Sequence, residues 1–407
     1  MGQLRRAGIR TASASFLLAI LALVTFVMTP MAANARPDSK AVISPLAFRV
    51  LERPSPVRGA DNRMHLAYEL QVVNQSPLDV TIKKIGIRGG KNLLGKAMTE
   101  TDIAGRINNF GGGTGATVLA GSNSMIIVDA TYSRSRKTPK RISHGVVLSW
   151  TDPTTSELKK LRFAGVRSRV GQRKAVRVDA PLRGGKWVGA NGCCVLNPHR
   201  GATLSIDGTI RVPERFAIDY VQLNDDDRLF SGPLNENSSY PYFGDPIYSV
   251  AKGKVVRVRD GLPEQTPGSL PTNATLQMAG GNHVVVNIGH GRFAFYAHLQ
   301  PGSITVKKGQ RIKSGRVIGK LGNTGNTDGA HLHFHIMDSA SPLQSNGLPF
   351  VFRKFRGQGF ITDEAALQAG GDPGIKRRLI GPHRNQLPLA NQIVSFGRRN
   401  GNGGVTP

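Results

Sequence analysis

The sequence predicts a mainly β protein in which an N-terminal β-sandwich-like domain is followed by a second β-rich domain. Short runs of β-branched and aromatic residues recur through residues 41–355, and clusters of Gly, Pro, Asn and Asp separate them. The first part of this region has short alternating strands at the spacing typical of a β-sandwich. The second part contains a run of three closely spaced histidines, which indicates where its chemistry lies.

Composition divides the 407-residue chain into five segments. Residues 1–35 have the pattern of a signal peptide, and residues 36–173 are expected to form the β-sandwich-like domain. Residues 174–186, rich in Arg, Lys and Gly, are interpreted as a linker, and residues 187–355 as the second β-rich domain. Residues 356–407 are expected to be a basic C-terminal tail, partly disordered, with one short helical turn.

The N-terminus indicates export. A segment with three arginines precedes an uncharged apolar run at residues 16–28, and Ala33-Asn34-Ala35 then supplies a small-residue cleavage pattern. The apolar run is shorter than the roughly 20 residues that a membrane-spanning helix needs, although an uncleaved anchor is the alternative. We therefore expect a secreted or periplasmic protein of the cell envelope, with no membrane span after the signal is removed.

The chain is strongly basic, with a formal net charge of +28 at pH 7. Outside the cytoplasm this charge favours an anionic envelope polymer or a membrane surface as a neighbour. The basic residues are dispersed along the chain, and no nucleic-acid-binding motif is present. Nucleic acid is therefore not expected as a partner.

The two cysteines, Cys193 and Cys194, are adjacent and cannot link distant parts of the fold. In an oxidising compartment they are expected either to form a vicinal disulfide or to pair between chains. A zinc site at this position is less favoured, because zinc sites usually space their thiolates.

The run His331-Leu332-His333-Phe334-His335 places three imidazoles on one side of a predicted strand, since residues two apart share a face. Leu332 and Phe334 would then pack on the opposite side. A polar strand face exposed to solvent is the alternative, but such a face gains little from three imidazoles. Neutral imidazole is a good ligand for Zn²⁺, so the run indicates a metal site.

With the motifs Tyr296-Ala297-His298-Leu299, Gly322-Asn323-Thr324-Gly325 and His331-Leu332-His333 in this order, the sequence resembles a known family. It is similar to the lysostaphin/LytM-type zinc endopeptidases, peptidase family M23, which cut peptide cross-links of bacterial peptidoglycan. The resemblance covers about residues 187–351. It implies an M23-type, β-rich catalytic domain, a Zn²⁺ cofactor, and peptidoglycan or its peptides as the partner.

The resemblance also implies roles for single residues. Asp219 and His333 match two of the family's zinc ligands. His298 and His331 match two histidines that act on the attacking water and on the developing oxyanion, without a distinction here between base and oxyanion donor. His335 stands where the family often has an acid or another polar residue, and no ligand role is assigned to it.

One position departs from the family pattern, because the first zinc ligand should lie four residues before Asp219 and that residue is Arg215. Three explanations are open. His199 could replace the ligand, if a hairpin between residues 202 and 217 returns the chain to the Asp219 strand. The protein could be a degenerate, zinc-free member. Finally, His283 or His290 could complete the site, although both are expected to be surface histidines.

The sequence therefore predicts an exported zinc endopeptidase with His199, Asp219 and His333 as metal ligands, and with His298 and His331 as catalytic residues. The alternative is a catalytically degenerate protein of the same fold that binds or activates other cell-wall hydrolases.

Overall fold

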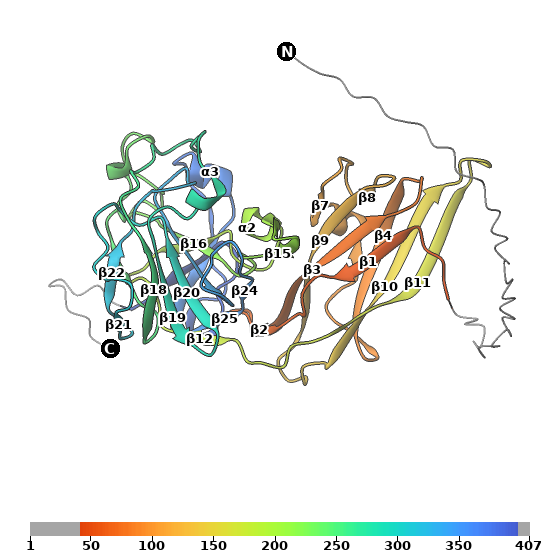
Figure 1. Ribbon diagram of the computed structural model, residues 1–407, viewed down its shortest axis with the longest axis horizontal. Helices are drawn as coiled ribbons and strands as arrows, with labels where there is room; N and C mark the ends of the chain where they lie inside the picture. The colour runs from red at the N-terminus through yellow and green to blue at the C-terminus, as the bar shows by residue number, and fades with distance from the viewer. Residues whose placement is uncertain (1–40, 398–407) are drawn as a thin grey trace, which may run out of the picture. The chain divides into compact units, whose positions relative to one another are not determined.

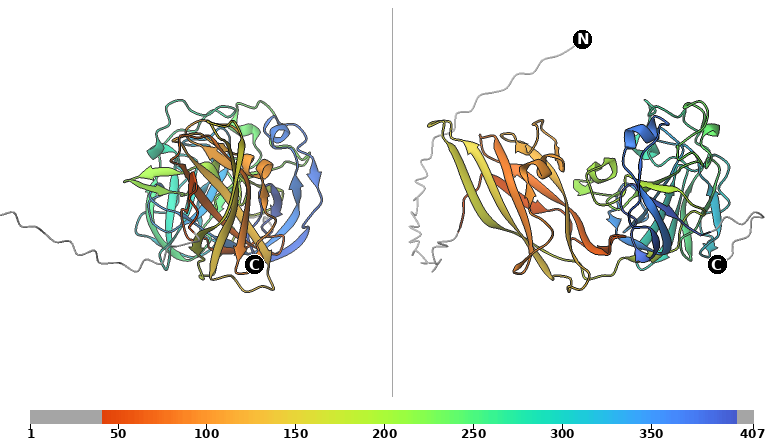
Figure 2. Two further views of the ribbon diagram at one scale, coloured as in Figure 1. Left: turned by 90° about the vertical axis from the view of Figure 1, so that its right-hand side faces the viewer. Right: turned by 180° about the vertical axis from the view of Figure 1, so that it is seen from behind.

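The computed structural model describes residues 41–397 (Figures 1 and 2). The described residues from Ser44 onward fall into one compact unit. The predicted mainly β fold class is confirmed, because strands supply most of the regular structure. The expected signal peptide and the end of the expected tail lie outside the described residues. Within the described part, no helix is long and apolar enough to cross a membrane.

The N-terminal strands, coloured orange to yellow in Figure 1, form two antiparallel sheets. The first sheet contains β1 (Leu46–Val50), β2 (Pro56–Arg58), β3 (Arg63–Asn74), β7 (Ile107–Asn109) and β9 (Asn123–Ser133). The second contains β4 (Val80–Gly89), β5 (Asn92–Leu93), β6 (Met98–Thr99), β8 (Thr117–Val118), β10 (Arg141–Thr151) and β11 (Leu158–Arg169). The short helix α1 (Glu100–Ala104) follows β6.

One apolar core lies between these two sheets. Leu66 and Leu70 of β3 join Ile82 and Ile85 of β4 in it, together with Val146 of β10, and all five are buried. Strand β3 contributes alternate residues because successive side chains point to opposite faces, and an irregularity in the pairing of β4 with β10 brings Ile82 and Ile85 to one face. The sandwich predicted from the sequence is therefore present.

A larger sheet of 13 strands follows, with the order β12-β25-β28-β13-β16-β23-β20-β19-β18-β21 and three further strands attached at its sides. Its strands are β12 (Val176–Val178), β13 (Trp187–Ala190), β16 (Ile218–Gln222), β18 (Gly253–Arg259), β19 (His283–Gly289), β20 (Arg292–Ala297), β21 (Arg311–Ile312), β23 (Leu332–Met337), β24 (Gly347–Leu348), β25 (Phe350–Ile361), β26 (Ile375–Lys376), β27 (Gly381–Gln386) and β28 (Gln392–Ser395).

Smaller elements connect these strands. Two two-stranded sheets pair β14 (Leu204–Ile206) with β15 (Thr209–Arg211), and β17 (Pro246–Tyr248) with β22 (Val317–Lys320). The helices are α2 (Pro198–Gly201), α3 (Glu364–Gln368) and the 3-10 turns η1 (Asn237–Ser239) and η2 (Leu276–Met278). Helix α3 is the short helical turn expected in the tail, and the side chain of Asp363 caps it.

The expected linker and tail contain more structure than their composition indicated. Residues 176–178 of the linker form β12, which pairs in parallel with β25. Strand β28 pairs with both β13 and β25 and buries Ile393 and Val394. Composition alone did not indicate these strands, because partners about 150 to 200 residues distant decide their burial. The interpretation of residues 356–397 as a tail therefore needs correction, since these residues complete the large sheet.

The centre of this sheet positions the histidine run. Strand β23 lies between β16 and β20, so it has a paired neighbour on each side. Leu332, Phe334 and Ile336 point into the main apolar core. The intervening residues His333 and His335 therefore share the opposite face, as the alternation of the sequence predicted.

Candidate metal centre

Asp219 and His333 meet because their strands pair in antiparallel register. The two residues are direct partners across β16 and β23, so their side chains project from the same face. Nδ1 of His333 lies 2.9 Å from Oδ1 of Asp219. Both side chains are buried, with 8% of Asp219 and 4% of His333 exposed.

His199 reaches the same carboxylate from a different part of the chain. It lies in α2, whose N-cap Asn197 accepts a hydrogen bond from the backbone N–H of Arg200 at 2.9 Å. The β14–β15 hairpin then returns the chain toward β16. Nε2 of His199 lies 3.0 Å from Oδ2 of Asp219, and the residue is 6% exposed. The structure thus brings His199, Asp219 and His333 together, with ligand atoms within 4.8 Å of one another.

The hydrogen bonds of His199 determine what its Nε2 can do. Its Nδ1 faces the carbonyl oxygens of Asn191 and Ala217 at 3.0 and 3.3 Å, so Nδ1 carries the hydrogen and donates it. A neutral ring then presents the Nε2 lone pair to the oxygen of Asp219. This lone pair and the carboxylate oxygen repel each other unless a proton or a metal ion lies between them. Two imidazole nitrogens and a carboxylate oxygen are a donor set suited to Zn²⁺, so these residues fit the metal that the sequence predicted.

The pKa shifts of His199 and Asp219 indicate that a positive charge beside the Asp219 carboxylate is favourable. Burial by itself would lower the pKa of His199, but the Asp219 carboxylate outweighs it and raises the pKa to about 9. Burial would raise the pKa of Asp219, and the neighbouring His199 and His331 instead hold it well below its usual range. The carboxylate is therefore ionised and attracts either a proton on His199 or a metal ion.

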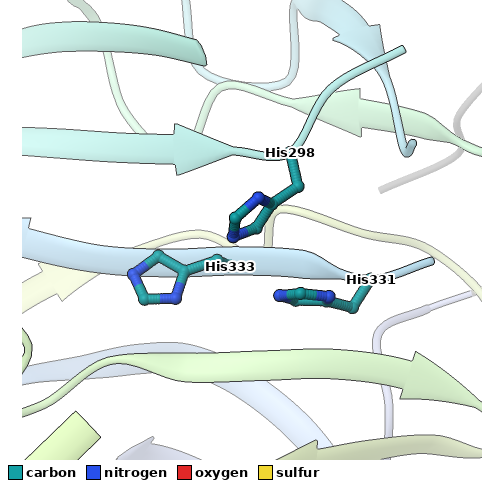
Figure 3. A group of neighbouring side chains, drawn as sticks. All are labelled: His298, His331 and His333. Atoms are coloured by element: carbon teal, nitrogen blue, oxygen red, sulfur yellow. The ribbon is translucent and has the colours of Figure 1, made fainter. Parts of the chain in front are cut away.

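His298 and His331 lie next to this cluster. Figure 3 shows their rings together with that of His333, with His298 at the end of β20 and His331 just before β23. The ring centroids of His298 and His331 are 4.5 Å apart, and Nε2 of His331 lies 3.5 Å from Oδ1 of Asp219. The three histidines form a group whose ligand atoms lie within 4.8 Å of one another.

Backbone carbonyls orient both rings. Nδ1 of His298 donates to the carbonyl of Thr324 at 2.7 Å, and Nδ1 of His331 donates to the carbonyl of Gly329 at 2.9 Å. In a neutral ring, Nε2 then carries the lone pair. Burial, followed by the charges of His331 and His333, holds the pKa of His298 well below its usual range.

The Gly-Asn-Thr-Gly motif shapes the loop that holds His298. Gly325 has a φ of +91°, and a Cβ at this position would lie 2.3 Å from the backbone nitrogen of Gly281. The hydroxyl of Thr324 accepts from the N–H of Asn282 at 2.9 Å and donates to a backbone carbonyl of the neighbouring loop. Only glycine fits this close approach, so the motif fixes the carbonyl that orients His298.

The other candidates for the missing ligand lie elsewhere. The guanidinium of Arg215 binds Glu69, outside the histidine cluster. Nδ1 of His283 faces a backbone carbonyl at 2.9 Å, and His290 is an exposed residue of the turn after β19. Among the described residues, neither histidine joins a group with metal-ligand spacing. The geometry therefore favours His199 over His283 and His290.

Two contacts at the cluster had no signal in the sequence. Nδ2 of Asn191 donates to Oδ2 of Asp219 at 2.8 Å, although 28 residues separate them. Nε2 of His333 lies 2.9 Å from Nδ1 of His335. Burial, then the charges of His333 and His199, holds the pKa of His335 well below its usual range, so its ring is neutral and can accept from His333.

Cys193 and Cys194, between Asn191 and α2, are bonded to each other. Of the two expected arrangements, the structure contains the vicinal disulfide.

The fold is β-rich and contains a buried centre of imidazole and carboxylate groups. In a comparison with protein-family models, residues 239–345 match the model of peptidase family M23. The chain therefore contains a peptidase M23 domain. The matched residues include His298, His331 and His333, whereas His199 and Asp219 precede them.

Curated relatives are similar over the same part of the chain. The peptidoglycan DD-endopeptidase ShyA of Vibrio cholerae serotype O1 is 32% identical over 102 residues, which are 25% of this chain and 20% of that protein. The glycyl-glycine endopeptidase ALE-1 of Staphylococcus capitis is 30% identical over 129 residues, 31% of each chain. The chain thus matches only about a fifth to a third of the length of these two relatives.

Among solved structures, the catalytic domain of lysostaphin from Staphylococcus simulans is 22% identical. The comparison covers 40% of this chain and 88% of that domain, with a TM-score of 0.23.

Proposed function

We propose that this protein is an exported zinc metalloendopeptidase that hydrolyses peptide bonds in peptidoglycan cross-links. The observation that carries the proposal is the convergence of His199 Nε2 and His333 Nδ1 on one buried carboxylate, 3.0 Å from Oδ2 and 2.9 Å from Oδ1 of Asp219. The M23 domain and the relatives named as peptidoglycan and glycyl-glycine endopeptidases support the substrate class.

In this proposal, His199 Nε2, His333 Nδ1 and the Asp219 carboxylate hold the metal. Three protein ligands leave a fourth position open, as in catalytic zinc sites generally. Zinc held there supplies Lewis acidity, which activates water and polarises the scissile carbonyl.

In this proposal, His298 and His331 transfer protons during the reaction. His298 and His331 both keep their Nδ1 hydrogen on a backbone carbonyl, so each directs an Nε2 lone pair away from its anchoring loop. Such a nitrogen can accept a proton from the attacking water, and once protonated it can donate to the developing oxyanion. The carbonyls of Thr324 and Gly329 fix these tautomers, so the rings need no rearrangement during the reaction.

A pocket of about 330 Å³ is a candidate site for part of the substrate peptide. It is lined by Leu262, Pro263, Gln265, Pro271, Thr272, Asn273, Ala274, Met278 and Gly325. Gly325 directly follows Thr324, whose carbonyl orients His298, so the pocket adjoins a proposed catalytic residue. Much of the pocket wall comes from the long loop at residues 262–277.

The location of the activity is part of the proposal. The signal-peptide pattern of residues 1–35 supports export, and a basic chain is suited to the anionic polymers of a bacterial envelope.

The test is to purify the chain without its signal segment, measure zinc per chain, and digest purified peptidoglycan. Mass spectrometry of the released fragments would identify the bond cut. We expect about one zinc per chain and new peptide ends, and neither zinc nor new ends from His333→Ala. A folded wild-type protein that binds no zinc and releases no fragments would contradict the proposal and favour the degenerate alternative.

A further inference from the structure

Arg215, at the position where a zinc ligand is expected, binds a carboxylate of the N-terminal sandwich. Its Nε donates to Oε1 of Glu69 at 3.0 Å and its Nη2 donates to Oε2 at 2.6 Å. Glu69 belongs to β3 and is fully buried, and Arg215 is 7% exposed. A guanidinium–carboxylate pair with two parallel donors fixes orientation as well as distance. This pair therefore ties the segment that leads into β16 to the sandwich.

Glu69 also holds the residue that follows His199. Nη2 of Arg200 donates to Oε1 of Glu69 at 3.1 Å and to the backbone carbonyl of Tyr68 at 3.3 Å. Arg200 is 1% exposed. Its Nε and Nη1 have no hydrogen-bond partner among the described residues. Its position in the core thus depends strongly on Glu69.

The charges in this cluster are unequal, with one carboxylate between two guanidinium groups. Burial would raise the pKa of Glu69, but Arg215 and Arg200 bring it below its usual value, so the carboxylate is ionised. Without this negative charge, two buried cations would face each other in a medium of low dielectric constant. Their repulsion would separate the segments that carry them.

Those two segments carry the proposed metal ligands. Arg200 adjoins His199 in the single turn of α2, and Arg215 lies four residues before Asp219. The segments also meet directly, because Nδ1 of His199 lies 3.3 Å from the carbonyl oxygen of Ala217. A shift of either arginine therefore changes the distance between His199 and Asp219.

We propose that Glu69 is a positioning residue for the metal centre, which it acts on through Arg200 and Arg215. The β-sandwich then has a defined role, since it supplies the anion that sets the spacing of His199 and Asp219. This inference rests on the proposed function, because it requires that the site binds zinc.

The test is the zinc affinity of full-length variants, measured by competition with a chromophoric chelator at a temperature where each variant is folded. Glu69→Gln keeps the shape of the side chain and removes its charge. We expect its zinc dissociation constant to rise about 10–100-fold, the range typical when a group that orients ligands is lost. The absorption spectrum of the Co²⁺-substituted variant should change as well, because the ligand geometry changes.

Two further variants separate positioning from simple stability. Glu69→Asp keeps the charge but is shorter, so it should recover part of the affinity that Glu69→Gln loses. Arg200→Met leaves the Glu69–Arg215 pair intact and removes the incompletely paired guanidinium. We expect it to fold even if Glu69→Gln does not, and to bind zinc more weakly than the wild type.

Gln386→Ala is the matched control, because Nε2 of Gln386 also reaches the N-terminal strands, at the carbonyl of Gly59 2.9 Å away, without touching the histidine cluster. It should lower stability and leave zinc affinity unchanged. The inference is overturned if the wild type binds zinc and Arg200→Met and the folded Glu69 variants bind it equally well. A wild type without zinc would instead overturn the proposed function itself.

Discussion

The described chain holds two buried clusters in which imidazole and carboxylate groups lie about 3 Å apart, and the two clusters differ in their demand for protons. In the first, His65 directs Nε2 to Asp61 and Nδ1 to Asp129, both at 3.0 Å. A protonated imidazole has two N–H donors, and each donor finds a carboxylate. Burial by itself would lower the pKa of His65, but the hydrogen bonds to Asp129 and Asp61 raise it to about 10.

The second cluster reverses these proportions, with one carboxylate, Asp219, between the rings of His199 and His333. His199 donates its Nδ1 hydrogen to backbone carbonyls, so only its Nε2 is directed at the carboxylate. The first cluster offers one imidazole to two carboxylates, which suits a proton, whereas the second gathers two imidazoles around Asp219, a donor set that suits a metal ion.

Cys194 lies beside the first cluster. Its sulfur forms a group with metal-ligand spacing together with His65 and Asp129. Its bond to Cys193 removes the thiolate that a metal would need. We therefore interpret the His65 cluster as an ion pair.

The largest expected effect comes from removing one carboxylate charge in each cluster. Asp219→Asn should abolish zinc binding and endopeptidase activity, because the remaining imidazoles lose the anion between them. Asp61→Asn should keep one zinc per chain and its activity while unfolding at a lower temperature. Elemental analysis and peptidoglycan digestion give the readout. Equal zinc content in both variants would contradict the distinction between the clusters.

Metal removal should destabilise the folded protein in a way that depends on Asp219. At free zinc about 1,000-fold above its dissociation constant, binding adds about 4 kcal/mol to the free energy of unfolding. A chelator should therefore lower the unfolding temperature of the wild type and of Asp61→Asn, and leave that of Asp219→Asn unchanged. Calorimetry with and without chelator measures this, and a wild type that is insensitive to the chelator would count against the metal site.

The His65 cluster should respond to pH instead. The folded-state pKa of about 10 exceeds the ordinary value of 6.5, so the stabilisation is complete below pH 6.5 and is lost as pH rises through 10. Its size is about 3 kcal/mol, reduced for the partial exposure of Asp61 and Asp129. Denaturant unfolding should show His65→Gln less stable than the wild type at pH 6 and nearly equal above pH 10. A constant difference across this range would show that His65 does not titrate as proposed.

Local patterns explain which parts of the site the sequence could predict. Alternation along β23 predicted that His331, His333 and His335 share a face, since a strand's side-chain period is fixed by its backbone. The turn at residues 207–208 predicted a hairpin, and the β14–β15 pair is present. That hairpin is why His199 could be named as a candidate from the sequence.

Long-range contacts explain what the sequence could not predict. Glu69 and Arg215 are 146 residues apart and meet because the turn before β16 lies against β3. Nothing near Arg215 indicated a buried carboxylate as its partner. Strands β25 and β28 were missed for the same reason, because their distant partners β12 and β13 pair with them to complete the sheet.

The smallest expected effect concerns His335, which extends the metal cluster by one ring. When its Nδ1 accepts from Nε2 of His333, His333 keeps the Nδ1 lone pair for the metal. His335→Leu removes this acceptor and should weaken zinc binding about 10–100-fold, whereas His335→Gln offers an amide oxygen and should retain most of the affinity. Chelator competition measures both variants. Equal losses would mean that packing around the buried ring matters more than its hydrogen bond. The His65 cluster has no counterpart to this effect, because both of its ring nitrogens already end on carboxylates.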